Sequence, residues 1–410
     1  MVQVVVPSSR RWSALLSKRA SDLPAKPRLD DPENQFKRIS FVYGFPDGDS
    51  LPSSAVANAT VRALEARGHE ALQYGSATGV PRFIEALLTK LRRDQGIEAG
   101  PENVLITAGG SQAVQLVLDA LVDWDDTILT EEPTWMGALR AFKNVGARPI
   151  PIPLREDGMD VDVLEGELTR LRAEGIQPKL IYVISNFQNP TGISSSRAKR
   201  ERIAALAAEH GTLVFEDDAY SDLRYAGEKI PPIYALDRSG STLYLGTLSK
   251  IMGAGMRIGW LLGPAELIQK LAVLKIDGCT NVFGSHVAAE WLPEHLEEHV
   301  AELRSIYHRR RDLMLAALAR HMPAGTTWTT PDGGFFIWVT LPEGLDTAHL
   351  STQAKERGVD FLTGRQCWVG ERGDNTMRLS FSFARDEQID RGIGILGEIV
   401  KGELLETGRG

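Results

Sequence analysis

Three apolar runs that end in polar residues decide the fold. Residues 180–192 read LIYVISNFQNPTG, residues 212–220 read TLVFEDDAY and residues 242–259 read TLYLGTLSKIMGAGMRIG. Each run begins with β-branched, aromatic and leucine residues, which is typical of a buried strand, and then passes into turn-forming or polar residues. A stretch with helical periodicity separates the first two runs. This alternation predicts an α/β domain with a mostly parallel sheet.

The same alternation continues on both sides of these runs. We expect seven strands, at Val104–Thr107, Thr127–Thr130, Arg148–Pro151, Leu180–Ser185, Thr212–Glu216, Thr242–Gly246 and Ile258–Leu262. Helical periodicity predicts helices at Gln112–Val122, Met136–Val145, Val161–Arg172 and Ser195–His210. From about residue 265 the pattern changes to helices at Leu267–Leu274 and Val287–Arg320, strands at Gly333–Thr340 and Thr376–Phe383, and a last helix at Asp386–Val400. The sequence therefore predicts a large domain with a seven-stranded sheet between helices, and a smaller α+β C-terminal domain.

Length and charge describe an ordinary globular protein. The chain has 410 residues, which favours two domains. We divide it into an N-terminal segment at 1–47 that packs on the small domain or a partner subunit, a large domain at 48–300 and a small domain at 301–410. The formal net charge is -8, whereas proteins that bind nucleic acid through its phosphates rely on Lys and Arg. We expect small-molecule ligands and no nucleic acid.

Cysteine and hydropathy patterns exclude other classes. The two cysteines, Cys279 and Cys367, form no spaced pair typical of a disulfide framework or zinc site. His295 and His299 are spaced as metal ligands on one helix turn, but we interpret them as part of a solvated, Glu-rich face and expect no metal. No stretch reaches the roughly 18 apolar residues of a membrane span, and no signal peptide is evident. We expect a cytoplasmic protein that does not bind membranes.

Polar residues gather where the predicted strands end, which is where ligands bind in open α/β sheets. Small residues with Ser111 and Gln112 lead from one strand into a helix, an arrangement suited to a phosphate. Asp217 and Asp218 end another strand, and because strand neighbours point to opposite faces, at most one of them faces the ligand crevice. Lys250 follows a third strand.

Each feature also has an ordinary explanation when taken alone. Ser111 and Gln112 can belong to a plain turn, the two aspartates to a solvated strand end, and Lys250 to the charged surface. The glycines around Arg257 do not match the order of a dinucleotide-binding loop that opens a helix. Together, however, these strand ends provide a phosphate cradle, amide and hydroxyl partners, a carboxylate and a lysine. A cofactor with a phosphate, a phenolic oxygen, a pyridine nitrogen and an aldehyde needs this set.

With this set, the chain resembles fold-type-I pyridoxal-phosphate enzymes, the aspartate-aminotransferase-like superfamily. Within it, the sequence is most similar to aminoadipate/kynurenine-type and multisubstrate aminotransferases. The resemblance extends from about residue 44 to the C-terminal helix. It rests on six pieces in the family's order, namely Gln73-Tyr74-Gly75, Gly110-Ser111-Gln112, Asn186 to Gly192, Asp217 to Tyr220, Ser249-Lys250 and Met377-Arg378-Leu379.

The resemblance implies a role for each matching residue. Lys250 would carry pyridoxal 5′-phosphate as a Schiff base and then shuttle a proton, and Asp217 would keep the pyridine nitrogen protonated. Asn189 and Tyr220 would bind the phenolic oxygen. The phosphate would be held by Ser111, Gln112, Thr247, Ser249 and Arg257.

Further implied roles concern the substrate and the partner subunit. Arg378, helped by Gly44 and Asn189, would bind the substrate α-carboxylate, although a surface salt bridge is the alternative for Arg378. Tyr74 would reach the phosphate of the neighbouring subunit, which implies a homodimer with composite active sites. Trp135 would stack on the ring where the subgroup commonly has Tyr, and Thr363-Gly364 replaces a frequent Pro-Gly.

The resulting prediction is a ping-pong aminotransferase that moves an amino group between an L-amino acid and a 2-oxo acid. The same lysine and aspartate could serve elimination, decarboxylation or oxidative deamination, since fold does not decide the reaction. A DNA-binding regulator with an aminotransferase-like domain and a cofactor-free binding protein are further alternatives. Phe41, Tyr43, Phe45 and Asp47 could form either an aromatic or a polar pocket for the substrate side chain.

Overall fold

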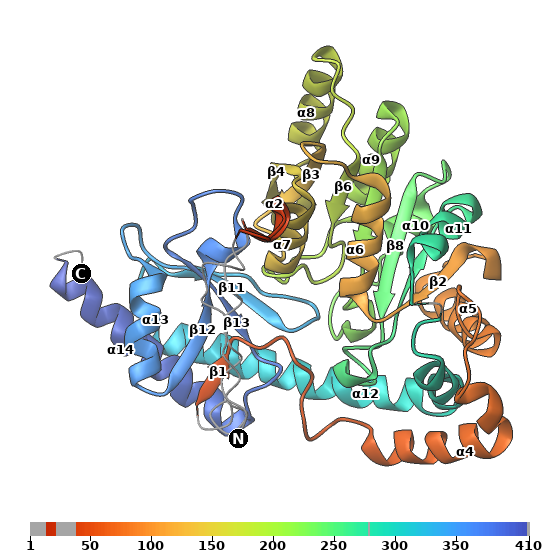
Figure 1. Ribbon diagram of the computed structural model, residues 1–410. Coiled ribbons are helices and arrows are strands. Elements are labelled where there is room, and N and C mark those ends of the chain that lie inside the picture. The colour runs from red at the N-terminus through yellow and green to blue at the C-terminus, as the bar shows by residue number, and fades with distance from the viewer. Residues whose placement is uncertain (1–13, 22–37, 278, 408–410) are drawn as a thin grey trace, which may run out of the picture.

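The computed structural model describes residues 14–21, 38–277 and 279–407. The described chain contains an eight-stranded sheet and a five-stranded sheet, and a long helix, α12 at Val282–His321, connects them (Figure 1). The strands are β1 Ile39–Phe41, β2 Val104–Thr107, β3 Thr127–Glu132, β4 Arg148–Arg155, β5 Gly158–Met159, β6 Leu180–Val183, β7 Leu213–Asp217, β8 Thr242–Thr247, β9 Gly259–Leu262, β10 Thr327–Trp328, β11 Phe336–Thr340, β12 Val359–Thr363 and β13 Thr376–Ser380. The other helices are α2 Lys18–Ser21, α4 Ser53–Ala71, α5 Pro81–Gln95, α6 Gly110–Leu121, α7 Met136–Val145, α8 Val161–Ala173, α9 Arg197–His210, α10 Ile233–Leu236, α11 Ala265–Leu274, α13 Thr347–Glu356 and α14 Asp386–Glu406, with short 3₁₀ turns at Pro101–Asn103, Ser221–Leu223, Ala254–Met256 and Gly364–Cys367.

The large sheet has the order β2-β9-β8-β7-β6-β3-β4-β5. Its central strands β8, β7, β6, β3 and β4 are parallel, while β9 runs antiparallel to both of its neighbours. The prediction of an α/β fold with a mostly parallel sheet is confirmed. The predicted strand count was one too low, because β5 is a two-residue strand at the sheet edge and too short to show periodicity.

Helices cover both faces of this sheet (Figure 1). On one face, apolar side chains of α6, α7 and α11 share a core with alternate strand residues such as Tyr182 and Phe215. On the other face, α8, α9 and α10 pack against Ile181 and Val214. Because neighbouring strand residues point to opposite faces, β6 and β7 contribute to both cores, which explains their continuous apolar sequence.

The small sheet has the order β1-β12-β13-β11-β10. The N-terminal strand β1 pairs in parallel with β12, at the edge of a sheet that is otherwise made from C-terminal residues. Helices α13 and α14 lie beside this sheet in Figure 1. Strands β1, β10 and β12 and helices α4, α5 and α13 are elements that the sequence pattern did not predict.

Helix α12 is the longest described element and spans 40 residues despite Pro293 in its interior. It packs on α4 and α5 beside the large sheet and on α14 beside the small one. The predicted boundary between residues 300 and 301 falls inside this helix, and the division into domains stays a prediction. His299 is only 8% exposed and its Nε2 lies 2.7 Å from the Ile251 carbonyl oxygen. The prediction that this histidine lies on a solvated face was therefore wrong.

The described residues contain neither a membrane-spanning helix nor a cluster of metal ligands. None of the described helices is both long and apolar enough to cross a membrane. Within the same residues, no cluster of three or more His, Cys, Asp or Glu side chains has the arrangement of a metal site.

Candidate active site

The carboxyl ends of β6, β7 and β8 bring three of the predicted residues together with a fourth from the small sheet. Asn189 follows β6, Asp217 ends β7 and Lys250 follows β8. Arg378 extends from β13, and its Nη1 donates a hydrogen bond of 2.8 Å to Oδ1 of Asn189. Residues nearly 190 positions apart in the sequence therefore meet at one edge of the large sheet.

Lys250 lies in a partly enclosed position between aromatic rings and backbone. Its Nζ donates a hydrogen bond of 2.9 Å to the Gly44 carbonyl oxygen and lies 5.5 Å from the centre of the Tyr220 ring. Burial, together with the positive charges of Arg378 and Arg257, lowers the pKa of Lys250 to about 8, while the nearby Asp217 opposes this shift. An amine with such a pKa is available as a nucleophile and as a base near neutral pH.

Asp217 is 6% exposed, and its two oxygens have different surroundings. Oδ2 accepts a hydrogen bond of 2.8 Å from the hydroxyl of Tyr182, whereas Oδ1 is buried and has no hydrogen-bond partner among the residues that the structure describes. Burial raises the pKa of Asp217 to about 6, while the Tyr182 hydrogen bond opposes this shift. A buried carboxylate oxygen without a partner is unfavourable, so this atom points to a missing cationic donor.

Asp218 faces the other side of the sheet, as the strand alternation predicts. Its oxygens accept hydrogen bonds of 2.8 Å from the Asn186 amide and 3.0 Å from the Tyr244 hydroxyl. Arg200 is fully buried nearby and also binds Asn186. These hydrogen bonds hold the loop after β6 on the side of the sheet away from the crevice. Asp217 is therefore the aspartate that faces the crevice.

Tyr220 and Arg378 enclose the crevice from the side of the small sheet. Tyr220 is 6% exposed, packs edge-on against the Phe335 and Phe336 rings, and is hydrogen-bonded to Asn189. Arg378 lies 4.2 Å above the centre of the Phe336 ring, bonds the Val42 carbonyl oxygen and keeps a buried Nε without a partner. The alternative of a surface salt bridge for Arg378 is therefore wrong.

An anion cradle lies at the start of α6. No side chain caps this helix, whose N-cap residue Gly109 has a φ of 82°. A Cβ at Gly109 would lie 2.8 Å from Nη2 of Arg257, so the backbone passes directly beside the guanidinium. Free N–H groups at a helix N-terminus together with an arginine suit a phosphate.

The hydroxyl groups of this cradle are already in place. Thr247 and Ser249 lie side by side with their hydroxyl oxygens 2.8 Å apart, and Ser111 is exposed at the first turn of α6. The Gln112 amide instead accepts a hydrogen bond from the Ala108 N–H and donates one to Asp277. Gln112 thus braces the strand-to-helix turn with its side chain.

Tyr74, Trp135 and Gly44 are the remaining predicted residues. Tyr74 is 85% exposed, and within the described part of the chain no hydrogen bond joins its side chain to Lys250 or the cradle. Trp135 is half-buried at the N-terminus of α7, where it packs against the apolar core between the sheet and that helix. Gly44 lies beside Phe336, whose Cζ would be 2.7 Å from a Cβ at this position.

Sequence reasoning missed two buried partners of the site. Tyr182 looks like an interior strand residue, and only the register of β6 against β7 shows that its hydroxyl reaches Asp217. Glu131 is fully buried at the end of β3 and accepts hydrogen bonds from the Ile184 N–H and the Gln188 amide. The sequence contained a signal for Glu131, because the charged pair Glu131-Glu132 directly follows the predicted strand Thr127–Thr130 and, in the structure, forms the buried end of β3.

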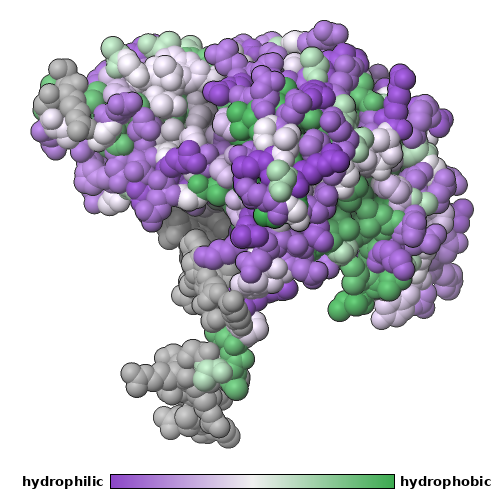
Figure 2. Space-filling view, turned by 90° about the horizontal axis from the view of Figure 1, so that it is seen from above, coloured by the Kyte–Doolittle hydropathy of each residue, from purple (hydrophilic) through white to green (hydrophobic). Residues whose placement is uncertain are grey.

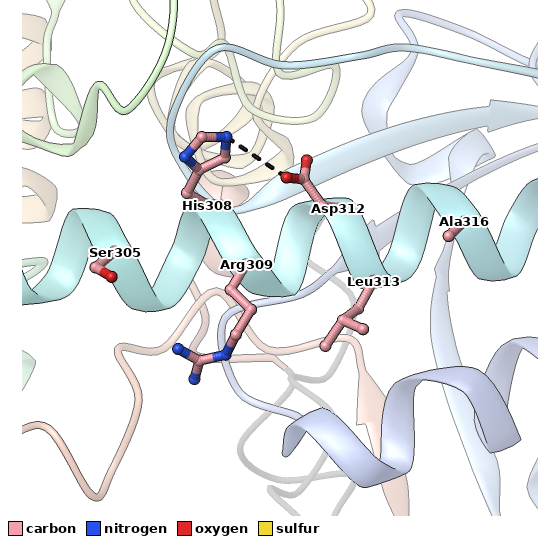
Figure 3. Close-up of a pocket in the computed structure, with 6 residues that line it drawn as sticks. All are labelled: Ser305, His308, Arg309, Asp312, Leu313 and Ala316. Carbon is pink, nitrogen blue, oxygen red and sulfur yellow. Dashed lines mark ion pairs between the residues drawn. The ribbon is translucent and has the colours of Figure 1, made fainter.

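A surface hollow of about 470 Å³ lies elsewhere, along the middle of α12 (Figure 3). It is lined by Ser305, His308, Arg309, Asp312, Leu313 and Ala316, all from that one helix. Its ionisable groups already have partners, since His308 pairs with Asp312 and Arg309 with Asp386. None of the residues around Lys250 lines this hollow. The candidate active site is therefore a separate place, at the edge of the large sheet.

The surroundings of Asp217 fit the pyridine ring of pyridoxal phosphate. A protonated pyridine nitrogen needs a buried anionic acceptor, and Oδ1 supplies one without a competing partner. The amine of lowered pKa and the anion cradle lie at the same sheet edge, as aldehyde and phosphate require. Fold and site thus define a pyridoxal-phosphate enzyme of fold type I.

The chain belongs to the aminotransferase class I and II family, whose model matches residues 39–396. Aromatic-amino-acid aminotransferase 1 of Thermococcus litoralis is 37% identical over 369 residues, covering 89% of this chain and 88% of the relative. The structure of Pyrococcus horikoshii kynurenine aminotransferase in complex with PMP has a TM-score of 0.90 at 36% identity, covering 96% of this chain and 98% of that one. Thermus thermophilus α-aminoadipate aminotransferase, complexed with N-(5′-phosphopyridoxyl)-L-leucine, has a TM-score of 0.87 at 33% identity, covering 96% and 99%. The protein is an enzyme that transfers amino groups and uses pyridoxal 5′-phosphate.

Proposed function

We propose that the crevice around Lys250 transfers the α-amino group of an L-amino acid to a 2-oxo acid in two half-reactions. The observation that carries this assignment of residues is the buried, unpartnered Oδ1 of Asp217 beside an amine of lowered pKa. Bound pyridoxal phosphate supplies an aldehyde that takes up the amino group and a ring that withdraws electrons from the substrate Cα.

Lys250 would hold the cofactor through Nζ and, once released by the substrate amine, act as the base at the substrate Cα. Its pKa of about 8 lets Nζ take up and return a proton near neutral pH. The Gly44 carbonyl oxygen, which accepts a hydrogen bond from Nζ, orients the amine. Asp217 would hold the proton on the pyridine nitrogen with its free oxygen.

Arg378 would bind the substrate carboxylate, with Asn189 as its neighbour. The guanidinium is held in place by Asn189, the Val42 carbonyl and the Phe336 ring, and its Nε is still free to donate. A planar guanidinium fixed in this way suits bidentate binding of a carboxylate. Asn189 and Tyr220 would also bind the phenolic oxygen.

The phosphate would lie against the α6 N-terminus, Arg257 and the hydroxyls of Ser111, Thr247 and Ser249, with the turn braced by Gln112. Trp135 would stack on the ring. The phosphate assignments rest on the contact between the Thr247 and Ser249 hydroxyls, on the closeness of Gly109 to Arg257, and on the uncapped N-terminus of α6.

We further propose that the substrate carries an aromatic or other large apolar side chain. Of the four residues that could form its pocket, Phe41 is fully buried and Asp47 forms an ion pair of 2.8 Å with Arg310. Tyr43 and Phe45 remain, on either side of Gly44. Their rings are stacked 4.9 Å apart, and Phe45 is 41% exposed.

We propose a homodimer with composite active sites. Exposed apolar side chains gather at the end of α11, where Val273 is 80% and Ile276 96% exposed. The Gly75 N–H donates a hydrogen bond of 3.1 Å to the Cys279 sulfur, which joins the Tyr74 segment to this turn in one surface. Figure 2 shows apolar residues gathered in one area of the face that it draws. A second subunit on this surface would cover Ile276 and could receive Tyr74.

We propose a cytoplasmic location, supported by the two cysteines. Cys279 and Cys367 are both free, and Cys367 is fully buried with its pKa raised by burial to about 11. Unpaired cysteines are typical of reducing compartments.

Borohydride reduction of the holoenzyme followed by peptide mass spectrometry tests the assignment of Lys250. We expect the mass of the reduced cofactor on the peptide that contains Lys250, and no labelling of this peptide in Lys250→Ala. Labelling of another lysine, or equal labelling in the variant, would contradict it.

A further inference from the structure

Two tyrosines, on the strands on either side of β7, each bind one of the two adjacent aspartates at the end of β7. Tyr182 on β6 donates a hydrogen bond of 2.8 Å to Oδ2 of Asp217, and Tyr244 on β8 donates one of 3.0 Å to Oδ2 of Asp218. Both tyrosines are at most 1% exposed. Asp217 faces the α6 and α7 side with the crevice, and Asp218 faces the opposite side, so only the first of these hydrogen bonds can influence the cofactor.

The geometry points to Tyr182 as the positioning residue that turns one oxygen of Asp217 toward the cofactor ring. By occupying Oδ2, its hydroxyl leaves Oδ1 as the single free acceptor, which is the oxygen without a partner. This inference rests on the proposed pairing of Asp217 with the ring nitrogen.

The Tyr182 side chain is itself held in place. Its ring packs edge-on against Phe142 at 5.5 Å and against Phe215 at 5.8 Å, between β6, β7 and α7. A rotation of Asp217 would leave the Tyr182 hydroxyl unpaired in this apolar core, which is unfavourable. The carboxylate is therefore fixed before the cofactor binds.

The hydroxyl also favours the charged form of Asp217, as do Lys250 and the Ala219 N–H, whereas the neighbouring acids Asp218 and Glu131 disfavour it. A donor to an ionised carboxylate stabilises the charge, so its removal raises the pKa of Asp217 further above its ordinary value. Since burial already raises this pKa to about 6, a protein without the hydroxyl has less ionised Asp217 near neutral pH. Such a protein should bind a protonated pyridine ring less tightly.

The test compares the affinity of the full-length apoprotein for pyridoxal phosphate with its affinity for an analogue whose ring nitrogen is replaced by C–H. The ratio of the two affinities reports only on groups that act through the nitrogen. For Tyr182→Phe we expect this ratio to fall about tenfold, with a larger fall at pH 6 than at pH 8, because a hydrogen bond to a charged group is lost. A purely structural role would weaken both ligands equally and leave the ratio unchanged.

Tyr244→Phe is the matched control, because it removes the equivalent hydroxyl from Asp218 on the far side. We expect it to keep the wild-type ratio, and an equal fall in both variants would overturn the inference. Asp217→Ala tests the proposed pairing of Asp217 with the ring nitrogen, on which the role of Tyr182 depends. If Asp217→Ala keeps the preference for the nitrogen-containing ring, the proposed role of Asp217 is wrong. If Asp217→Ala loses it while Tyr182→Phe keeps it, only the role of Tyr182 is wrong.

A double variant covers the case in which Tyr182→Phe does not fold. Tyr182→Phe is then combined with Asp217→Asn and compared with Asp217→Asn alone. Under the inference the two proteins have the same ratio, because Tyr182 acts only through Asp217. A difference of more than about threefold between them would overturn it.

Discussion

Glu131 is a buried acid whose charge opposes folding. It is fully buried, has a second oxygen without a partner, and burial raises its pKa to about 8. Because the pKa in the folded protein lies above the unfolded value, this group stabilises the fold at pH values below about 4.5. That contribution is lost as the pH rises toward 8.

Glu131→Gln should therefore stabilise the apoprotein in alkaline but not in acidic solution. At pH 4 we expect variant and wild type to unfold at similar urea concentrations, since Glu131 is then largely neutral in the folded and in the unfolded protein. At pH 8 the variant should be more stable by about 2 kcal/mol or more. Glu165→Gln, at a half-exposed position of α8 where the carboxylate pairs with Arg202, is the control for the chemical change and should not stabilise the protein at pH 8. Equal stability of Glu131→Gln and wild type at pH 8 would contradict a neutral Glu131.

Single residues were predictable from the sequence where position along the chain determines their role. Asp217 is the last residue of a strand, Lys250 and Asn189 follow shortly after one, and the sheet brings these strand ends together. Tyr182 and Glu131 act through neighbours on other strands. Their contacts depend on strand order and register, which a single sequence does not contain.

Gly109, the N-cap residue of α6, keeps the phosphate cradle open. Gly109→Ala would place a methyl group 2.8 Å from Arg257 at a φ of 82°. We expect the affinity for pyridoxal phosphate to fall about tenfold, through loss of a charge-assisted contact, with little change for pyridoxal, which lacks the phosphate. Fluorescence titration of the apoprotein with both ligands measures this.

Gly211→Ala is the control for backbone strain. Gly211 also has a positive φ of 62°, but nothing lies within 4 Å of its Cβ position at the end of α9. Gly211→Ala should lose about 1 kcal/mol of stability from its left-handed conformation, and Gly109→Ala should lose more, because a φ of 82° with a ψ of 173° is adopted essentially by glycine alone. Only Gly109→Ala should lose phosphate-dependent affinity, and the same loss in Gly211→Ala would contradict the steric explanation.

Helix α12 holds the segment with Gly44 through Arg310. This arginine pairs with Asp47 at 2.8 Å, both side chains being 7% exposed, and also bonds Asp386 and the Ser382 carbonyl. Removing one partner of a buried ion pair leaves an unpaired charge, so Arg310→Ala should lose about 3–5 kcal/mol in urea unfolding and raise the substrate KM.

Arg309, the preceding residue of α12, provides the comparison. Its pair with Asp386 at 2.6 Å is largely exposed, with exposed fractions of 54% and 33%. Arg309→Ala should therefore lose less than about 1 kcal/mol and leave KM unchanged. Similar losses in the two variants would show that the Asp47 contact does not hold the segment.

The elements that the sequence did not predict have weak signals for physical reasons. Helix α4 buries Ala59, Ala63 and Ala71, so its apolar face carries little hydrophobicity. Strand β1 has three residues, and β12 contains the buried Asp360. The strands of the large sheet, covered on both faces, have long apolar runs and were found.

In the proposed dimer, Ile276 lies in the contact between the two subunits, so a substitution there should change the oligomeric state. Ile276→Asp would place a charge in the subunit contact, so we expect monomers by sedimentation velocity and weaker binding of pyridoxal phosphate. Leu405→Asp is the control, because Leu405 is 75% exposed on α14, which lies beside the small sheet. A wild-type protein that sediments as a monomer, or an Ile276→Asp variant that remains dimeric, would contradict the proposed surface.

We propose that the site around Lys250 moves an amino group and does nothing else to the substrate. The direct measurement is a single turnover of the holoenzyme with an aromatic L-amino acid labelled with ¹⁵N, without a 2-oxo acid. We predict about one equivalent of 2-oxo acid per site and the label in pyridoxamine phosphate, with no reaction in Lys250→Ala. Release of labelled ammonia or of carbon dioxide, turnover that depends on oxygen, or full activity of Lys250→Ala would show that the site catalyses another reaction or does not depend on Lys250.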